Sequence, residues 1–216
     1  DKDFDKKVER TKQRPIASGK ISIKQSVIYI LILCLVSFVI LIQFNSKTIY
    51  LGLGSMILAF SYPFMKRITY WPQLFLGLTF NWGMIMACTA ILDQISTEII
   101  LLYLSAIFWT LGYDTIYGVQ DIADDEIIGI KSTAIKFKEN IKLFVGACYL
   151  ITFLLIIYVF KKNIGINLST FFIFMFSLSL IYQIKIFNKN NPMNCLKAFK
   201  INNYSGIFMF TTILLS

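Results

Sequence analysis

Hydrophobic residues in this chain come in long, nearly uninterrupted runs that are separated by short polar segments. Each run is close to the roughly 20 residues that a helix needs to cross a bilayer. Because every backbone N–H and C=O in hydrocarbon must be paired within its own segment, we interpret these runs as helices rather than strands. The predicted fold class is all-α, a polytopic transmembrane helical bundle with seven spans. These spans cover residues 26–44, 49–64, 71–92, 99–113, 143–160, 164–182 and 201 to the end.

Residues at the ends of the runs support the predicted helix boundaries. Ser22 followed by Gln25 forms a capping-box pattern before the first span. Pro63 is expected to end the second span, and Pro72 is expected in the first turn of the third, where a missing N–H is tolerated.

The distribution of basic residues predicts the orientation in the membrane. Of the 21 Lys and Arg, all but Lys47, Lys161 and Lys162 fall on the side that carries the N-terminal segment. By the positive-inside rule that side is cytoplasmic. The net charge of +9 is then explained by topology and by attraction to anionic membrane lipid, so we expect no nucleic-acid partner.

Composition narrows the chemistry further. The chain is 56% hydrophobic and 15% charged, which is typical of a membrane protein, and it has no histidine. Its four cysteines are isolated in the sequence, so neither a zinc site nor a disulfide framework is expected. The sequence lacks an initial Met and stops inside an apolar run, from which we expect a fragment.

Two polar segments, residues 3–19 and 113–134, hold most of the acidic residues. At 100° per residue, Asp114, Asp121 and Asp125 share one face of a helix, and Asp1 and Asp5 lie one turn apart. Clustered carboxylates repel one another, and oxygen-only ligands suit Mg²⁺, which shares its coordination shell with water and phosphate oxygens. The alternative is that these are solvated loops whose charges only set topology.

Basic residues near these carboxylates are expected to face phosphate groups. They are Arg10, Lys12, Arg14, Lys66, Arg67 and Lys131. A metal-bound diphosphate at the mouth of an apolar bundle suggests a lipid diphosphate as substrate, because a long isoprenoid tail stays in the membrane while its head group reaches the polar face.

The residues that carry this chemistry resemble a known family, the UbiA-type intramembrane prenyltransferases. DKDFDKKVERTKQRPIASG at residues 1–19 resembles the second half of the first aspartate motif, and YDTIYGVQDIADDEIIGIKSTA at 113–134 resembles the second motif in full. SYPFMKRITYWPQLFLG at 61–77 is similar to the intervening segment of the 4-hydroxybenzoate polyprenyltransferase branch. The resemblance implies one domain over residues 1–216, truncated at the N-terminus and within the last helix, with nine helices expected in the parent protein.

The resemblance also implies an activity and a set of site residues. The activity is Mg²⁺-dependent transfer of a polyprenyl group from polyprenyl diphosphate to the ring carbon ortho to the hydroxyl of 4-hydroxybenzoate, in ubiquinone biosynthesis. The matching metal and diphosphate positions are Asp1, Asp5, Asp121 and Asp125.

Roles for the aromatic substrate follow from the same assignment. Arg67 is expected to bind the aromatic carboxylate, because guanidinium is suited to bidentate contacts. The ring proton is expected to pass to a carboxylate such as Asp121 or to released diphosphate. Asp114 beside Tyr113 is expected either to contact the ring hydroxyl or to support the residues that contact the substrate.

Other interpretations remain open at this point. Another branch of the same family, such as haem O synthase or a menaquinone-pathway enzyme, shares the metal and diphosphate motifs. A cation-coupled transporter is disfavoured, because transporters place acidic groups in broken helices at the midplane, whereas here nearly all lie in loops. We expect a multi-pass protein of the bacterial cytoplasmic membrane, with the mitochondrial inner membrane as the alternative. The oligomeric state and the prenyl chain length are not readable from the sequence.

Overall fold

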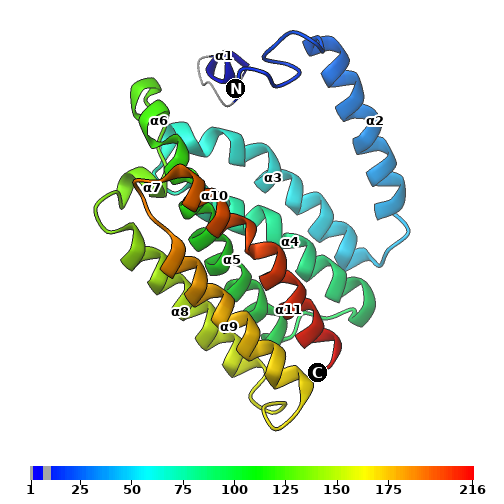
Figure 1. The fold of residues 1–216 in the computed structure, drawn as a ribbon. Coiled ribbons are helices and arrows are strands. Elements are labelled where there is room, and N and C mark those ends of the chain that lie inside the picture. Colours follow the sequence, from blue (N-terminus) through cyan, green and yellow to red (C-terminus); the bar gives the residue numbers. More distant parts are fainter. Residues whose placement is uncertain (1, 7–10) are drawn as a thin grey trace.

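The computed structural model describes residues 2–6 and 11–216, and over these residues the chain consists of helices and turns without a strand (Figure 1). Its helices are α1 (Lys2–Asp5), α2 (Ile23–Leu41), α3 (Ser46–Ile68), α4 (Pro72–Leu92), α5 (Thr97–Gly118), the 3₁₀ turn η1 (Val119–Asp121), α6 (Ile122–Ile128), α7 (Thr133–Lys136), α8 (Ile141–Val159), α9 (Leu168–Ile186), α10 (Pro192–Lys200) and α11 (Asn202–Leu214). The all-α prediction is confirmed.

Each predicted span corresponds to one helix, and in order these are α2, α3, α4, α5, α8, α9 and α11. Over the described residues, six of these helices are long and apolar enough to cross a membrane. The seventh, α11, has 13 residues and is therefore about 20 Å long, shorter than the roughly 30 Å hydrocarbon core.

Helix boundaries follow the capping residues. Ser22 and Gln25 form the predicted capping box at the start of α2, and Pro72 occupies the first turn of α4, as predicted. The prediction that Pro63 ends the second span is wrong, because α3 continues through Pro63 to Ile68. Proline within a membrane helix is tolerated where neighbouring groups satisfy the backbone, and here Pro63 borders a polar cavity that is described below.

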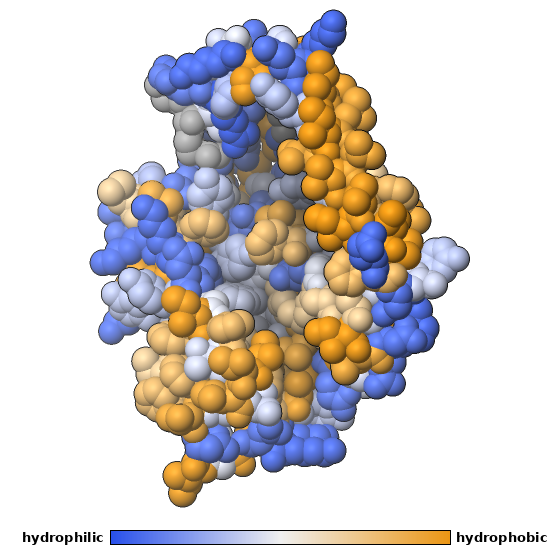
Figure 2. Space-filling model, turned by 90° about the vertical axis from the view of Figure 1, so that its right-hand side faces the viewer, coloured by the Kyte–Doolittle hydropathy of each residue, from blue (hydrophilic) through white to orange (hydrophobic). Residues whose placement is uncertain are grey.

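Helix α5 lies at the centre of the bundle, packed between α4 and α8 (Figure 1). Its close packing with α8 depends on Gly112, where a side-chain carbon would overlap the buried ring of Tyr149. Helix α2, in contrast, has no buried residue and stands apart from the other long helices except at its end, where Leu41 lies against Gly52 of α3. Figure 2 shows a face on which apolar side chains cover broad areas and the surface between them is hollowed.

A network of buried polar side chains joins α5, α8, α9 and α11. The hydroxyl of Tyr149 donates to Oε1 of Gln183, whose Nε2 donates to Oδ1 of Asn202 at 3.2 Å and to Oγ of Ser205 at 3.1 Å. Trp109 Nε1 also donates to Asn202 Oδ1, at 2.9 Å. Hydrogen bonds of this kind between membrane helices contribute about 0.6 kcal/mol each, so the network fastens α11 to α5, α8 and α9.

Candidate active site

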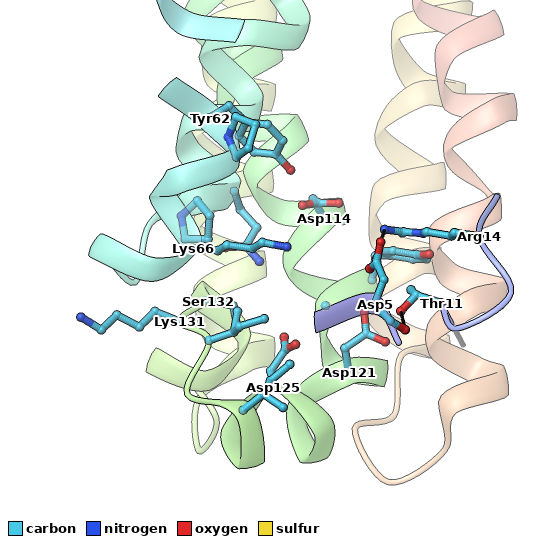
Figure 3. Close-up of a pocket in the computed structure, with 17 residues that line it drawn as sticks. Asp5, Thr11, Arg14, Tyr62, Lys66, Asp114, Asp121, Asp125, Lys131 and Ser132 are labelled. Carbon is cyan, nitrogen blue, oxygen red and sulfur yellow. Dashed lines mark hydrogen bonds and ion pairs between the residues drawn. The ribbon is translucent and has the colours of Figure 1, made fainter. Parts of the chain in front are cut away.

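A cavity of about 370 Å³ opens at the end of the bundle that carries most of the basic residues. Helices α3, α4, α5 and α6, the segment that precedes α7 and the N-terminal segment form its wall (Figure 3). The lining residues are Asp5, Thr11, Arg14, Tyr62, Pro63, Lys66, Pro72, Gln73, Asp114, Tyr117, Gly118, Asp121, Asp125, Ile128, Ile130, Lys131 and Ser132. Acidic and basic side chains from segments far apart in the sequence therefore meet in one space.

Three carboxylates of this cavity come from a nearly continuous helical stretch. Helix α5 ends at Gly118, η1 follows directly, and α6 starts at Ile122, so helical geometry persists from Asp114 to Asp125. The prediction that Asp114, Asp121 and Asp125 share one face is confirmed, since all three line the cavity. Figure 3 shows them around the same space, with Asp125 at the level of Ser132 and Asp114 nearer Tyr62.

The fourth carboxylate, Asp5, reaches the cavity from α1. Arg14 Nη1 lies 3.0 Å from Asp5 Oδ1 and 3.2 Å from Oδ2, and Thr11 Oγ1 donates to the backbone oxygen of Asp5 at 3.0 Å. These contacts fold the first aspartate motif onto itself. Two residues of the predicted site, Asp1 and Arg10, lie outside the described residues.

The predicted basic residues Lys66 and Lys131 both line the cavity. The backbone N–H of Lys131 donates to the carbonyl of Lys66 at 2.8 Å, and Lys131 Nζ donates to the carbonyl of Ile68 at 3.2 Å. The segment between α6 and α7 is thereby tied to the end of α3. The ammonium group of Lys66 points toward the cavity that the carboxylates of α5 and α6 line, whereas the Lys131 side chain points away from it (Figure 3).

Three residues that the sequence predicted for this site, Lys12, Arg67 and Tyr113, do not line the cavity. Arg67 is exposed on α3, because neighbouring helical residues point about 100° apart and Lys66 is the one that faces the cavity. Tyr113 is turned toward Trp109 and Phe199, with ring centroids 6.0 and 5.8 Å away. Their roles in substrate binding stay predictions.

The cavity also contains uncharged polar residues that sequence reasoning missed. Tyr62 lies one helical turn before Lys66, and Tyr117 lies one turn after Asp114, so helical spacing from the charged residues was a usable signal for both. Gln73 at the start of α4 had no such signal, because its partner is distant in sequence. Its Oε1 accepts a hydrogen bond from the backbone N–H of Thr133 at 2.9 Å.

The donors available for a metal are carboxylate oxygens. In the described part of the chain, no three carboxylate, cysteine or histidine side chains come together closely enough to enclose an ion. Mg²⁺ needs no such enclosure, since it is usually bound by one or two carboxylates, several waters and the phosphates of a substrate. Asp5, Asp121 and Asp125, which line the cavity, fit that mode of binding.

Comparison with known proteins now gives the family. Residues 1–210 match the profile described as the UbiA prenyltransferase family. The chain belongs to the UbiA prenyltransferase family. With six helices that are long and apolar enough to span a bilayer, it is a multi-pass membrane protein.

Curated relatives within the UbiA family are similar over nearly the whole chain. A 4-hydroxybenzoate geranyltransferase 2 from Lithospermum erythrorhizon is 40% identical over 99% of this chain and 70% of its own length. A mitochondrial 4-hydroxybenzoate polyprenyltransferase from Drosophila pseudoobscura pseudoobscura is 38% identical over 100% of this chain and 54% of its own length. A 4-hydroxybenzoate octaprenyltransferase from Tolumonas auensis is 37% identical over 100% of this chain and 76% of its own length. The chain thus spans between about half and three quarters of these relatives.

A solved structure confirms the fold. The apo structure of a UbiA homologue from Aeropyrum pernix K1 superimposes with a TM-score of 0.83 at 22% identity, covering 98% of this chain and 79% of that chain. At this identity the likeness concerns the UbiA fold alone.

Proposed function

We propose that the protein transfers a polyprenyl group from polyprenyl diphosphate to the ring carbon ortho to the hydroxyl of 4-hydroxybenzoate, in ubiquinone biosynthesis. The observation that carries this proposal is the cavity in which carboxylates meet the ammonium group of Lys66 and the guanidinium of Arg14 at the polar end of an apolar bundle. The names of the curated relatives support 4-hydroxybenzoate as the acceptor, in preference to a haem or a menaquinone precursor.

The family implies Mg²⁺, and the oxygen donors of the cavity fit it. Asp5, Asp121 and Asp125 would hold the metal, together with Asp1, which lies outside the described residues. When bound, Mg²⁺ neutralises negative charge on the diphosphate oxygens. An ion coordinated mainly by phosphate oxygens and water needs only one or two of these carboxylates.

Basic residues of the cavity bind the diphosphate. Lys66 and Arg14 supply positive charge there, and Arg10 and Lys131 are proposed to add to it, the Lys131 side chain by turning away from the carbonyl of Ile68. These groups stabilise the charge that develops on the leaving diphosphate more than they stabilise the bound substrate, which is what lowers a barrier. The apolar helices around the cavity exclude water from the allylic centre.

The bond changes follow from this arrangement. The bond between C1 of the prenyl chain and the diphosphate oxygen breaks, and the diphosphate leaves with the electron pair. The ring carbon ortho to the phenol oxygen forms a new bond to C1, and the ring then loses the proton at that carbon. Asp121 or the released diphosphate accepts this proton.

The aromatic acid needs a cation for its carboxylate and a polar group for its hydroxyl. We propose Arg67 for the carboxylate, and we add Lys66 as a second candidate, because it lines the cavity. Asp114 and Tyr62 lie at one side of the cavity, apart from Asp125 (Figure 3), and are proposed to contact the ring hydroxyl. Tyr113, which is turned toward Trp109 and Phe199, is also proposed to bind the substrate.

Relatives named above include bacterial and mitochondrial proteins. We propose that the membrane is the bacterial cytoplasmic membrane, with the mitochondrial inner membrane as the alternative. In both cases the cavity faces the side that carries the basic residues, which is the cytoplasm or the matrix.

The test is prenylation in membranes that contain the protein expressed from its full reading frame. Labelled 4-hydroxybenzoate, a polyprenyl diphosphate and Mg²⁺ are expected to give a lipid-soluble product, and omission of Mg²⁺ or the variant Asp121→Asn is expected to abolish it. Asp124→Asn is the matched control, since this neighbouring carboxylate does not line the cavity. Turnover of a haem or a naphthoate without turnover of 4-hydroxybenzoate would refute the proposed acceptor.

Arg67→Gln and Lys66→Gln separate the two candidates for the carboxylate. Replacement of the residue that binds the carboxylate is expected to raise the KM for 4-hydroxybenzoate. Arg67→Gln is expected to leave the KM for polyprenyl diphosphate unchanged, whereas Lys66→Gln is expected to raise it, because Lys66 also binds the diphosphate.

A further inference from the structure

Gln73 occupies an unusual position for an uncharged polar side chain. It lies in the first turn of α4, is only 7% exposed, and lines the cavity described above. A buried amide has up to four hydrogen bonds to satisfy, so the partners of each of its two ends show what it does.

The orientation of the amide is fixed by its partner. Its Oε1 lies 2.9 Å from the backbone nitrogen of Thr133. A backbone N–H only donates, so the oxygen of the amide must be at that end and the NH₂ group at the other. The assignment of the two ends follows from chemistry alone.

The partner itself is held firmly in place. Thr133 is fully buried, and its Oγ1 lies 2.7 Å from Oγ1 of Thr115, which is also fully buried. Ser132 Oγ accepts from the N–H of Ile135, and the N–H of Lys131 donates to Lys66. Because the acceptor end of Gln73 is tied to this rigid segment, its NH₂ group points in one fixed direction.

The NH₂ group has no acceptor within the described part of the chain. There, no protein oxygen accepts a hydrogen bond from Nε2, and Thr48 Oγ1 is the one side-chain polar atom that is both sealed from solvent and unpaired. Nε2 is therefore open to the cavity that Gln73 lines. Gly118 lies beside it and also lines the cavity, and a side-chain carbon at residue 118 would approach Nε2 to 3.3 Å.

We propose that Gln73 Nε2 donates a hydrogen bond to a diphosphate oxygen of the prenyl donor. The proposal rests on the proposed function. Ser132, which lines the same cavity, belongs to the segment that fixes Gln73, and Lys66, whose ammonium group points into the cavity (Figure 3), supplies positive charge there. A donor whose direction is set before the ligand arrives loses little entropy on binding, which makes it suited to an anionic oxygen.

The variants Gln73→Glu and Gln73→Met separate ligand binding from a purely structural role. Glutamate keeps an oxygen for the N–H of Thr133 but has no NH₂ group, whereas methionine loses both ends without adding charge. Both variants are expected to raise the KM for polyprenyl diphosphate at least about tenfold, as for loss of a hydrogen bond to a charged group. Only Gln73→Met is expected to lower the thermal midpoint.

Two further measurements test whether the group that Gln73 contacts is the diphosphate. Affinity for inorganic diphosphate with Mg²⁺, measured by calorimetry, is expected to fall in both variants, and further in Gln73→Glu because its carboxylate also repels the diphosphate, while the KM for 4-hydroxybenzoate stays unchanged. Gly118→Ala is expected to give a smaller effect in the same direction, because the added carbon presses on Nε2.

Three results would overturn the proposal. One is a KM for polyprenyl diphosphate in Gln73→Glu and Gln73→Met equal to that of the wild type. Another is a rise confined to the KM for 4-hydroxybenzoate, which would assign the donor to the aromatic acid. The third is a loss of stability and kcat without any change in diphosphate affinity. A wild-type protein that binds diphosphate but does not prenylate 4-hydroxybenzoate would instead refute the proposed function, and the calorimetric comparison would still test the contact.

Discussion

Gly112 is the point at which the central helix α5 comes closest to α8, and replacing it by alanine tests how tightly the bundle is packed. The added carbon would overlap Cε1 of Tyr149 and lie 2.8 Å from Cδ1. The ring has little room to move, because it is 3% exposed and its hydroxyl donates to Gln183. The ring or the whole of α8 must therefore shift to accept the methyl group.

The size of the effect follows from two opposing contributions. Forcing an extra carbon into a well-packed core typically destabilises by about 1–3 kcal/mol, and the tethered ring places Gly112→Ala toward the upper end. Replacing a helical glycine by alanine stabilises by about 0.5–1 kcal/mol. The net loss is about 2 kcal/mol, which for a chain of this size corresponds to a fall in Tm of about 4–8 °C.

The assay is thermal unfolding in detergent, followed by helical circular dichroism, with Gly83→Ala as the matched control. Gly83 also lies in a long apolar helix, α4, but an added carbon there meets nothing within 4 Å. In a Tyr149→Phe background the ring loses its tether, so the penalty for Gly112→Ala is expected to shrink. Equal melting temperatures for Gly112→Ala and Gly83→Ala would refute the packing argument.

Two further predictions concern polar groups. Arg14→Gln removes the ion pair with Asp5, and because the Arg14 side chain is 52% exposed, the free energy of unfolding is expected to change by less than about 1 kcal/mol. The affinity for inorganic diphosphate, measured by calorimetry, is expected to fall severalfold. An unchanged affinity would show that Arg14 only positions Asp5. Burial raises the pKa of the Cys195 thiol, whose Sγ donates to the carbonyl of Asn188 at 3.3 Å. In a variant that keeps only this cysteine, maleimide labelling at pH 7 is expected to be slow in the folded protein and to accelerate with rising pH or unfolding, whereas fast native labelling at pH 7 would contradict the burial.

The apolar runs predict where the helices of the bundle form and in which order, because each span has to satisfy its own backbone in hydrocarbon. They overstate the last one, since α11 is too short to span the membrane. They locate the ends less well. The sixth run begins near residue 164, but α9 begins at Leu168, since the side chain of Asn167 accepts from the N–H of Thr170 and caps the helix there. Hydropathy does not detect that hydrogen bond, and it also does not show that α3 continues through Pro63 to Ile68.

Helical periodicity also predicts part of the cavity. A repeat of 100° per residue is enough to place Asp114, Asp121 and Asp125 on one face, because η1 interrupts the helix only briefly. The same rule, applied to Lys66 and Arg67, shows that only one of two neighbours faces a given cavity, and the structure selects Lys66. Which face of α3 points inward depends on how α3 packs against other helices, and the sequence of α3 alone does not specify that packing.

The remaining part of the cavity depends on contacts between segments that are distant in sequence. The segment from Ile130 to Thr133 carries Lys131 and Ser132 into the wall, and its N–H groups at Lys131 and Thr133 donate to oxygens of α3 and α4. A short motif read alone does not specify those acceptors, since one is a backbone carbonyl and the other a glutamine about sixty positions earlier. The position of Lys131 is therefore a property of the packed bundle, and the ends of α3 and α4 determine the geometry of the second aspartate motif as much as the motif itself.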